Sequence, residues 1–305
     1  MIDVAERFYS PLYLAATALF LAAAVCGAHI VQDVLIGVLT LGVVLFGLPH
    51  GAIDPLVAKK AMGGHPFYSW QAFSLIYAST ALLYGLLWWL WPTAILATFL
   101  GMSALHFGTD WDRRGNAWTR LAYGAAVVTL PLLFHCREVA AIYGSLGASG
   151  TERFVSVSRV VALIGFPIAM LAALAQWRQR KADLLEFGGI LASALVLPPL
   201  LFFACYFCLL HSPRHLLATA RRMDLRSGGE LVRTVAPAVA ASVAAGAALW
   251  AWLPAGQGDE RILLVVFIGL AALTLPHMAL AALVRRANVP YAPPLIPAQA
   301  GREIL

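Results

Sequence analysis

Apolar runs long enough to cross a bilayer follow one another along the chain, separated by short polar turns. An α-helix spans the hydrocarbon core with about 20 residues, and a short or re-entrant segment needs somewhat fewer. Residues 136–152, which are polar and rich in Gly and Ser, are predicted to be the longest loop on their side. The pattern predicts an all-α fold, a polytopic transmembrane helical bundle. The predicted spans are residues 11–28, 34–50, 71–91, 92–110, 118–135, 155–177, 187–215, 233–253 and 262–284.

The run at residues 187–215 is interrupted by Pro198 and Pro199, and the distribution of Lys and Arg decides how it is interpreted. As one crossing, it would place the arginines of residues 221–233 opposite most other cations. If the two prolines form the turn of a short hairpin, most cations fall on one side, as the positive-inside rule prefers. We therefore predict about eight full crossings plus a short pair, about 8–10 membrane segments, with the N- and C-termini cytoplasmic. The cations left on the opposite side are Arg137, Arg153, Arg159 and Arg261.

Composition agrees with a membrane protein. Of the 305 residues, 61% are hydrophobic and 12% are charged, and the mean hydropathy is +0.80, whereas a soluble domain is about 25% charged. We expect one multi-pass domain of the cell inner membrane over residues 1–305, with an extended Pro-rich tail at 288–305. The N-terminus has no basic region of the signal-peptide kind, so the first run is expected to be a retained span. The net charge of +6 reflects an excess of Lys and Arg in the loops on one side of the membrane. The sequence has no basic patch with interleaved aromatic residues of the kind that binds nucleic acid.

The four cysteines do not indicate a disulfide framework. Cys205 and Cys208 have the spacing of a redox motif, but they lie inside an apolar run without a βαβ context. They are therefore expected to be small buried core residues.

Two histidines, His211 and His215, directly follow a strongly apolar run at residues 200–210. Positions four apart lie on one face of a helix, so both imidazoles can point at the same atom, as a metal ion requires. The alternative is that each histidine is a hydrogen-bonded packing residue. Pro213 either kinks this helix or begins a new one with Ser212 as its N-cap. Both arrangements keep the two rings close together.

Two other predicted spans end in related sequences, GLPHGAID at residues 47–54 and SALHFGTD at residues 103–110. Each carries a histidine, a nearby glycine and an aspartate four residues on: His50 with Asp54, and His106 with Asp110. Under the predicted topology these histidines share the cytoplasmic half of the membrane with the pair described above, and His277 falls at a similar depth. The other three histidines are expected away from this level, His29 and His135 on the far side of the membrane and His65 in a polar loop.

Convergence of four histidines at one depth favours a metal site. All-imidazole ligation suits zinc, copper, iron or nickel. Four neutral ligands on iron(II) leave coordination positions open for dioxygen. Carboxylates that hydrogen-bond to ligating imidazoles would offset part of the metal charge and fix the tautomer, and Asp54 and Asp110 are the candidates. The alternative for both aspartates is interfacial capping or solvation.

At these motifs the sequence resembles the Brp/Blh family of membrane-integral β-carotene 15,15'-dioxygenases, which are found with microbial rhodopsins. The matching segments are residues 46–54, 104–110, 211–215 and 275–278, with a weaker match at residues 132–135 followed by Glu138. The resemblance extends from about residue 40 to residue 285.

The resemblance implies a carotenoid cleavage dioxygenase that splits the central double bond of β-carotene, or of a related carotenoid, with O2 to give two molecules of retinal. It implies a mononuclear non-haem iron(II) cofactor, Fe(2+), bound by His50, His106, His211 and His215. His277 joins the two aspartates as a second-shell candidate. A polyene in the lipid bilayer would enter a tunnel between helices, and the retinal could pass to a rhodopsin. The aromatic residues considered for the tunnel are Phe107, Trp111, Phe202, Phe203, Tyr206 and Phe207.

Other classes remain open from the residues alone. A di-iron hydroxylase or desaturase would need roughly twice the ligands, in several His-x-x-x-His boxes, and this chain has one such box among eight histidines. Helices broken at Pro49, Pro213 and Pro276 fit a multi-span transporter. Paired histidines on facing helices could ligate haem in an electron carrier. Cofactor content separates these possibilities.

Overall fold

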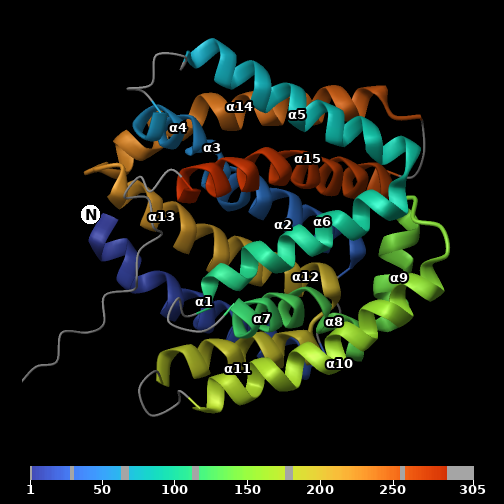
Figure 1. Ribbon diagram of the computed structural model, residues 1–305. Helices are drawn as coiled ribbons and strands as arrows, with labels where there is room; N and C mark the ends of the chain where they lie inside the picture. Colours follow the sequence, from blue (N-terminus) through green and yellow to red (C-terminus); the bar gives the residue numbers. More distant parts are fainter. Residues whose placement is uncertain are drawn as a thin grey trace, which may run out of the picture.

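The computed structural model describes residues 2–27, 31–62, 69–111, 117–175, 181–254 and 258–286. Within these ranges all regular secondary structure is helical, as the hydrophobic pattern predicts. The helices lie roughly side by side in a bundle (Figure 1). His29, His65 and the Pro-rich tail lie outside the described residues.

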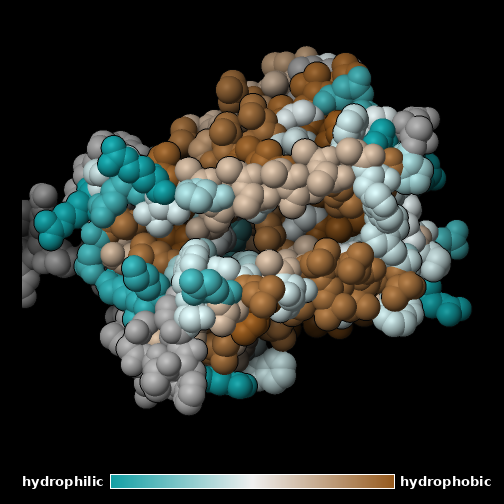
Figure 2. All heavy atoms as spheres, turned by 90° about the horizontal axis from the view of Figure 1, so that it is seen from above, coloured by the Kyte–Doolittle hydropathy of each residue, from teal (hydrophilic) through white to brown (hydrophobic). Residues whose placement is uncertain are grey.

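Within the described ranges, six segments are long and apolar enough to cross a membrane. On the face shown in Figure 2, apolar side chains cover most of the middle and hydrophilic ones gather toward its two ends, as expected of a bundle that crosses a bilayer. The six segments are Gln32–Met62, α5 (Trp70–Leu90), α10 (Thr151–Ala175), Pro199–Arg222, α14 (Gly228–Trp252) and α15 (Gly258–Arg286). Two shorter apolar stretches are Ser10–Val25, in α1 (Ile2–Val25), and Leu184–Val196, in α11 (Lys181–Val196). The helices between α5 and α10 are α6 (Pro92–Phe107), η2 (Gly108–Asp110), α7 (Ala117–Thr129), α8 (Pro131–Phe134) and α9 (Cys136–Ser145).

The chain turns at the two prolines as predicted. Helix α11 ends at Val196, and α12 (Pro199–Ala204) begins at Pro199. In Figure 1, α11 runs toward the right and the segment from α12 to α13 (Ser212–Arg222) returns to the left. Proline suits the first turn of a helix because it has no N–H to leave unpaired there.

The prediction of a loop at residues 136–152 is wrong for its first ten residues, which form α9. Val139 and Tyr143 lie four residues apart on one face of this helix, and both are buried in the main core. Burial of that face outweighs the polar and glycine-rich composition of the segment.

Two π-helical segments precede the proline-containing histidine motifs. In the Gln32–Met62 segment, η1 (Val43–Gly47) lies between α2 (Gln32–Gly42) and α3 (Leu48–Ala52), which is followed by α4 (Asp54–Met62). In the other segment, η3 (Cys205–His211) lies between α12 and α13. A proline clashes with the carbonyl four residues earlier, so a widened turn at that position lets Pro49 and Pro213 stay within a continuous helix. Ser212 has helical backbone angles and makes no side-chain cap. Of the two alternatives for Pro213, the one in which Ser212 caps a new helix is therefore excluded.

The four histidine-bearing segments run in one direction, from right to left in Figure 1: α2 to α4, α6, α12 to α13, and α15. Their histidine motifs therefore reach a similar level of the bundle, as the predicted topology requires. The N-terminus and the C-terminal end of α15 also lie at the left end. That this end faces the cytoplasm stays a prediction.

Close packing of α7 on α6 fixes the end of α6, from which the second histidine motif projects. A Cβ atom on Gly124 would lie 1.8 Å from the carbonyl oxygen of Ala104 and 2.6 Å from the amide nitrogen of Gly108. A Cβ on Gly108 would in turn lie 2.5 Å from the carbonyl oxygen of Arg120. Only glycine permits this separation of the two backbones, as is common between membrane helices.

Candidate metal centre

Five histidines from four segments meet inside the bundle. His50 comes from α3, His106 from α6, His211 from η3, His215 from α13 and His277 from α15. For the nine pairs in ring contact, the ring centroids lie 4.6 to 6.2 Å apart. Three of the five side chains are buried, and those of His50 and His215 are partly buried. The structure thus brings together the four histidines named from the sequence and adds His277 to them.

The ring nitrogens divide into an outer set with protein partners and an inner set without. Nδ1 of His50 contacts the carbonyl oxygen of Gly47, and Nδ1 of His211 and of His277 contact carboxylates. Among the described residues, no hydrogen-bond partner exists for four buried nitrogens: Nε2 of His106, His211 and His277, and Nδ1 of His215. A buried polar atom without a partner costs about 1–3 kcal/mol. Several such atoms in one cluster are suited to binding a metal ion.

The spacing of the rings fits one metal ion. With a metal–nitrogen bond of about 2.1 Å, an imidazole centroid lies roughly 3.2 Å from the ion, so two ligating rings lie roughly 4.5 Å apart at right angles and 6.4 Å apart when opposite. All nine pairs in ring contact fall within this interval. The widest of them are His50 with His106, at 6.0 Å, and His211 with His215, at 6.2 Å. Of the five rings, only His211 and His277 are not in contact with each other.

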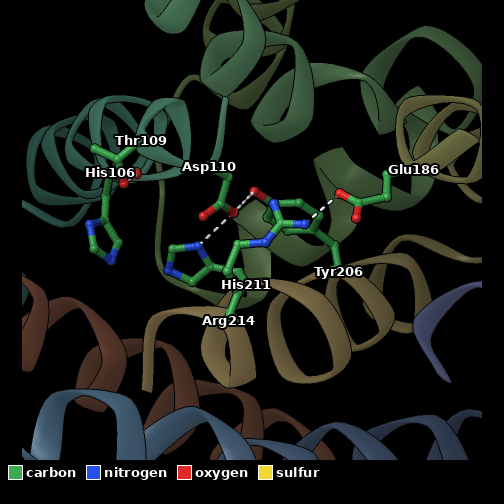
Figure 3. A network of polar contacts seen from close by, with 7 residues as sticks. All are labelled: His106, Thr109, Asp110, Glu186, Tyr206, His211 and Arg214. Carbon is green, nitrogen blue, oxygen red and sulfur yellow. Dashed lines mark hydrogen bonds and ion pairs between the residues drawn. The ribbon is translucent and has the colours of Figure 1, made fainter. Parts of the chain in front are cut away.

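Asp110 orients one of the rings. Its carboxylate accepts a hydrogen bond from Nδ1 of His211 at 2.9 Å and another from the Tyr206 hydroxyl at 2.8 Å (Figure 3). The Asp110 side chain is only 5% exposed. Such a buried carboxylate fixes the tautomer of its imidazole and leaves Nε2 free to bind a metal.

Asp54 makes an equivalent arrangement on the other side of the cluster. Its carboxylate oxygens lie 2.8 and 3.0 Å from Nδ1 of His277, and one of them accepts a hydrogen bond from the Tyr77 hydroxyl at 2.9 Å. Asp54 is 2% exposed, which excludes the alternative of a solvated interfacial residue. Both aspartates therefore hydrogen-bond to imidazoles as expected, but to a histidine of another segment, not to the histidine four residues earlier.

An ion pair lies beside the His211–His215 motif. Arg214, between the two histidines, contacts the buried carboxylate of Glu186 on α11 (Figure 3). Ser10 on α1 donates a hydrogen bond to the same carboxylate. These contacts tie α13 to α1 and α11. Sequence reasoning did not identify Glu186, although an acidic residue directly before a predicted span was the signal available.

Apolar space adjoins the histidines. One cavity is lined by His50, His106 and His277 together with mainly apolar side chains. A second cavity is lined almost entirely by apolar and aromatic residues. The residues common to both are Phe99, Ser103, Phe107 and Phe203, so the two cavities adjoin. Of the aromatic residues considered for a tunnel, Phe107, Phe202, Phe203, Tyr206 and Phe207 line one or both cavities.

Two other residues singled out from the sequence lie away from this space. Trp111 lines neither cavity and stacks on Tyr123 instead, with ring centroids 5.1 Å apart. His135 makes no ring contact with the five clustered histidines, and its Nδ1 lies 3.4 Å from Glu138. The four cysteines are free thiols, as expected, and Cys205 and Cys208 are buried in the core.

The fold and the site together define a class: a multi-pass helical membrane protein with a buried polyhistidine centre beside an apolar cavity. The comparisons with known proteins make this specific. A sequence profile of the beta-carotene 15,15'-dioxygenase family matches residues 41–285. The chain belongs to this family, so both the resemblance seen in the motifs and the prediction of a dioxygenase enzyme are confirmed.

Two relatives cover most of the chain. The "Beta-carotene 15,15'-dioxygenase" of uncultured marine bacterium 66A03 is 29% identical over an alignment of 248 positions, and the match covers 78% of this chain and 90% of the relative. The "Probable beta-carotene 15,15'-dioxygenase Blh" of Halobacterium salinarum is 31% identical over an alignment of 280 positions, and the match covers 77% of this chain and 80% of the relative. No solved structure gives a significant match to the chain.

Proposed function

We propose that this protein cleaves the central double bond of β-carotene with O2 and releases two molecules of retinal, at a single iron(II) held by His50, His106, His211 and His215. The observation that carries the proposal is the group of buried imidazole nitrogens without a partner among the described residues. Their rings are spaced as ligands of one ion, beside an apolar cavity that His50, His106 and His277 line. Family membership and the names of both relatives support the reaction.

The reaction needs only the polyene and O2. The central carbon–carbon bond and the O–O bond break, and each new aldehyde takes one oxygen atom, so no further reductant is required. Bound iron(II) would supply the redox chemistry that activates dioxygen. The protein has to hold the metal with open coordination positions, bring one double bond next to it and exclude water.

The residues around the cluster are suited to these tasks. Asp110 fixes the orientation of the His211 ring, and its negative charge offsets part of the metal charge in a low dielectric. Phe99, Phe107 and Phe203 connect the space beside the histidines with the second cavity, which offers apolar walls to a long polyene. A carotenoid dissolved in the bilayer could enter this space laterally, without crossing an aqueous phase.

The geometry argues against the haem alternative. A haem iron offers imidazoles only its two axial positions, which lie opposite each other. Here at least three imidazoles lie close to one another, since His106 and His211 have centroids 4.6 Å apart and His106 and His277 have centroids 5.0 Å apart. A porphyrin plane cannot pass between rings packed in this way.

Expression in a β-carotene-accumulating bacterium tests the proposal. Cells with the unchanged protein should lose β-carotene and gain retinal, as read by chromatography of extracted pigments. A His211→Ala/His215→Ala variant should leave β-carotene intact, whereas a His135→Ala control should behave like the unchanged protein. Unaltered β-carotene beside a folded, iron-loaded protein would refute the assigned substrate, and a folded protein without iron would favour a transporter.

A further inference from the structure

His277 is in ring contact with three of the four proposed ligands. Its ring centroid lies 5.4 Å from that of His50, 5.0 Å from that of His106 and 5.3 Å from that of His215. These distances fall inside the interval of roughly 4.5 to 6.4 Å for two imidazoles on one ion. His50, His106 and His277 also offer one nitrogen each such that all three nitrogens lie within 4.8 Å of one another.

The two nitrogens of His277 have different surroundings. Nδ1 faces the Asp54 carboxylate at 2.8 and 3.0 Å and therefore carries a proton. Nε2 is buried and has no hydrogen-bond partner among the described residues. A histidine kept only for packing would pair both nitrogens, and a protonated one would need an acceptor at Nε2. A neutral ring whose Nε2 lone pair points into the cluster is the form that binds a metal.

His277 and His211 are each held by the same kind of hydrogen-bond chain, which runs from a tyrosine through an aspartate to the histidine. In one case Tyr77 donates to Asp54 and Asp54 accepts from Nδ1 of His277. In the other, Tyr206 donates to Asp110, which accepts from Nδ1 of His211. The Tyr–Asp–His chains approach the cluster from different helices, and each ends in a buried, partnerless Nε2. Carboxylate–histidine pairs of this kind are the usual outer support of a metal-bound imidazole.

We propose that His277 is a fifth metal ligand and that Asp54 and Tyr77 hold it in the ligating tautomer. The proposal rests on the proposed function for the identity of the metal, iron(II). It goes beyond the four-histidine set because it assigns a ligand to α15 and two positioning residues to α4 and α5. Five imidazoles around an ion that accepts six ligands leave one position open.

Metal affinity and rescue by imidazole test the proposal. Full-length protein in lipid nanodiscs is loaded anaerobically with iron(II) and titrated with a competing chelator. His277→Ala should weaken iron binding by at least about 100-fold and Asp54→Asn by about 10–100-fold, the range found for outer carboxylate partners. Millimolar imidazole should restore iron binding to His277→Ala by filling the space of the lost ring, and X-ray absorption at the iron edge should then return to the unaltered spectrum. His135→Ala is the matched control and should bind iron normally.

Three outcomes would overturn the proposal. Unchanged iron affinity and an unchanged absorption edge in His277→Ala would show that the ring is not a ligand. If that variant does not fold, Asp54→Asn keeps the size of the side chain, and unchanged affinity in it would count equally against the role of His277. Iron binding to His277→Ala that is weakened but not restored by imidazole would indicate a packing role. A protein that binds iron as predicted but leaves β-carotene intact would refute the proposed function alone.

Discussion

Asp110→Asn is the substitution from which most can be learned about the site. Asparagine keeps the size of the side chain and one oxygen acceptor, but it removes the negative charge. The carboxylate of Asp110 accepts hydrogen bonds from both His211 and Tyr206 and is buried. Its charge therefore acts on the cluster through a medium of low dielectric, where the effect is strong.

The expected loss of iron affinity can be bounded. Removing the outer partner of a metal-bound histidine weakens metal binding by about 10–100-fold, which is about 1.4–2.7 kcal/mol. Tyr206→Phe removes one of the two hydrogen bonds and leaves the charge, so its effect should stay below about tenfold. We expect the order of iron affinity to be unchanged protein, then Tyr206→Phe, then Asp110→Asn.

The assay is chelator competition on the purified protein, with thermal unfolding of the metal-free form as a control for folding. Retinal production at saturating iron separates an effect on metal binding from an effect on the reaction. If Asp110→Asn is stably folded and binds iron as tightly as the unchanged protein, Asp110 does not support a metal ligand. The assignment of His211 to the metal would then lose its main structural argument.

Three further outcomes follow from the packing and the surface. Gly124→Ala would place a Cβ 1.8 Å from a backbone oxygen of the facing helix, so thermal unfolding should reveal a loss of at least about 1–3 kcal/mol, whereas Gly101→Ala, which meets nothing within 4 Å, should be neutral. Phe203→Trp adds volume where the two cavities meet, and it should raise KM for β-carotene several-fold without changing iron content; an unchanged KM would place the substrate elsewhere. Lys60 hydrogen-bonds to Asp224 and holds the pKa of that carboxyl below its ordinary value of 3.8. Because this pKa is lowered on folding, the ionised carboxyl of Asp224 stabilises the fold above its ordinary pKa. The stabilisation is lost as the pH falls through the pKa of the folded state. Unfolding experiments should therefore show a small loss of stability in acid for the unchanged protein, and this loss should be absent from Asp224→Asn.

The depth of the histidines could be predicted from the sequence because span length and the positions of cations fix direction and level in a membrane. His50 and His106 each follow an apolar run of similar length, and His211 and His215 follow another. Segments that run in one direction therefore present their motifs at one level. The turn at Pro198 and Pro199 could be predicted for the same reason, since the positive-inside rule prefers the arrangement that places most cations on one side.

The partners across the cluster could not be predicted in this way. Asp54 lies four residues after His50, and local spacing suggested that the two belong together, yet Asp54 contacts His277 of α15. Which helices become neighbours depends on packing between distant segments, such as the glycine contact of α6 with α7, and no local pattern records it. The depth of His277 was predicted, but its ring contacts with His50, His106 and His215 could not be predicted for the same reason.

The most direct test is the stoichiometry of the reaction with purified, iron-loaded protein and β-carotene in air. We predict two molecules of retinal for each β-carotene consumed, loss of the activity when iron is chelated, and recovery with iron(II) but not with zinc(II), which lacks redox chemistry. Equal activity of the metal-free protein, or products cut at another double bond, would contradict a central cleavage at the histidine cluster.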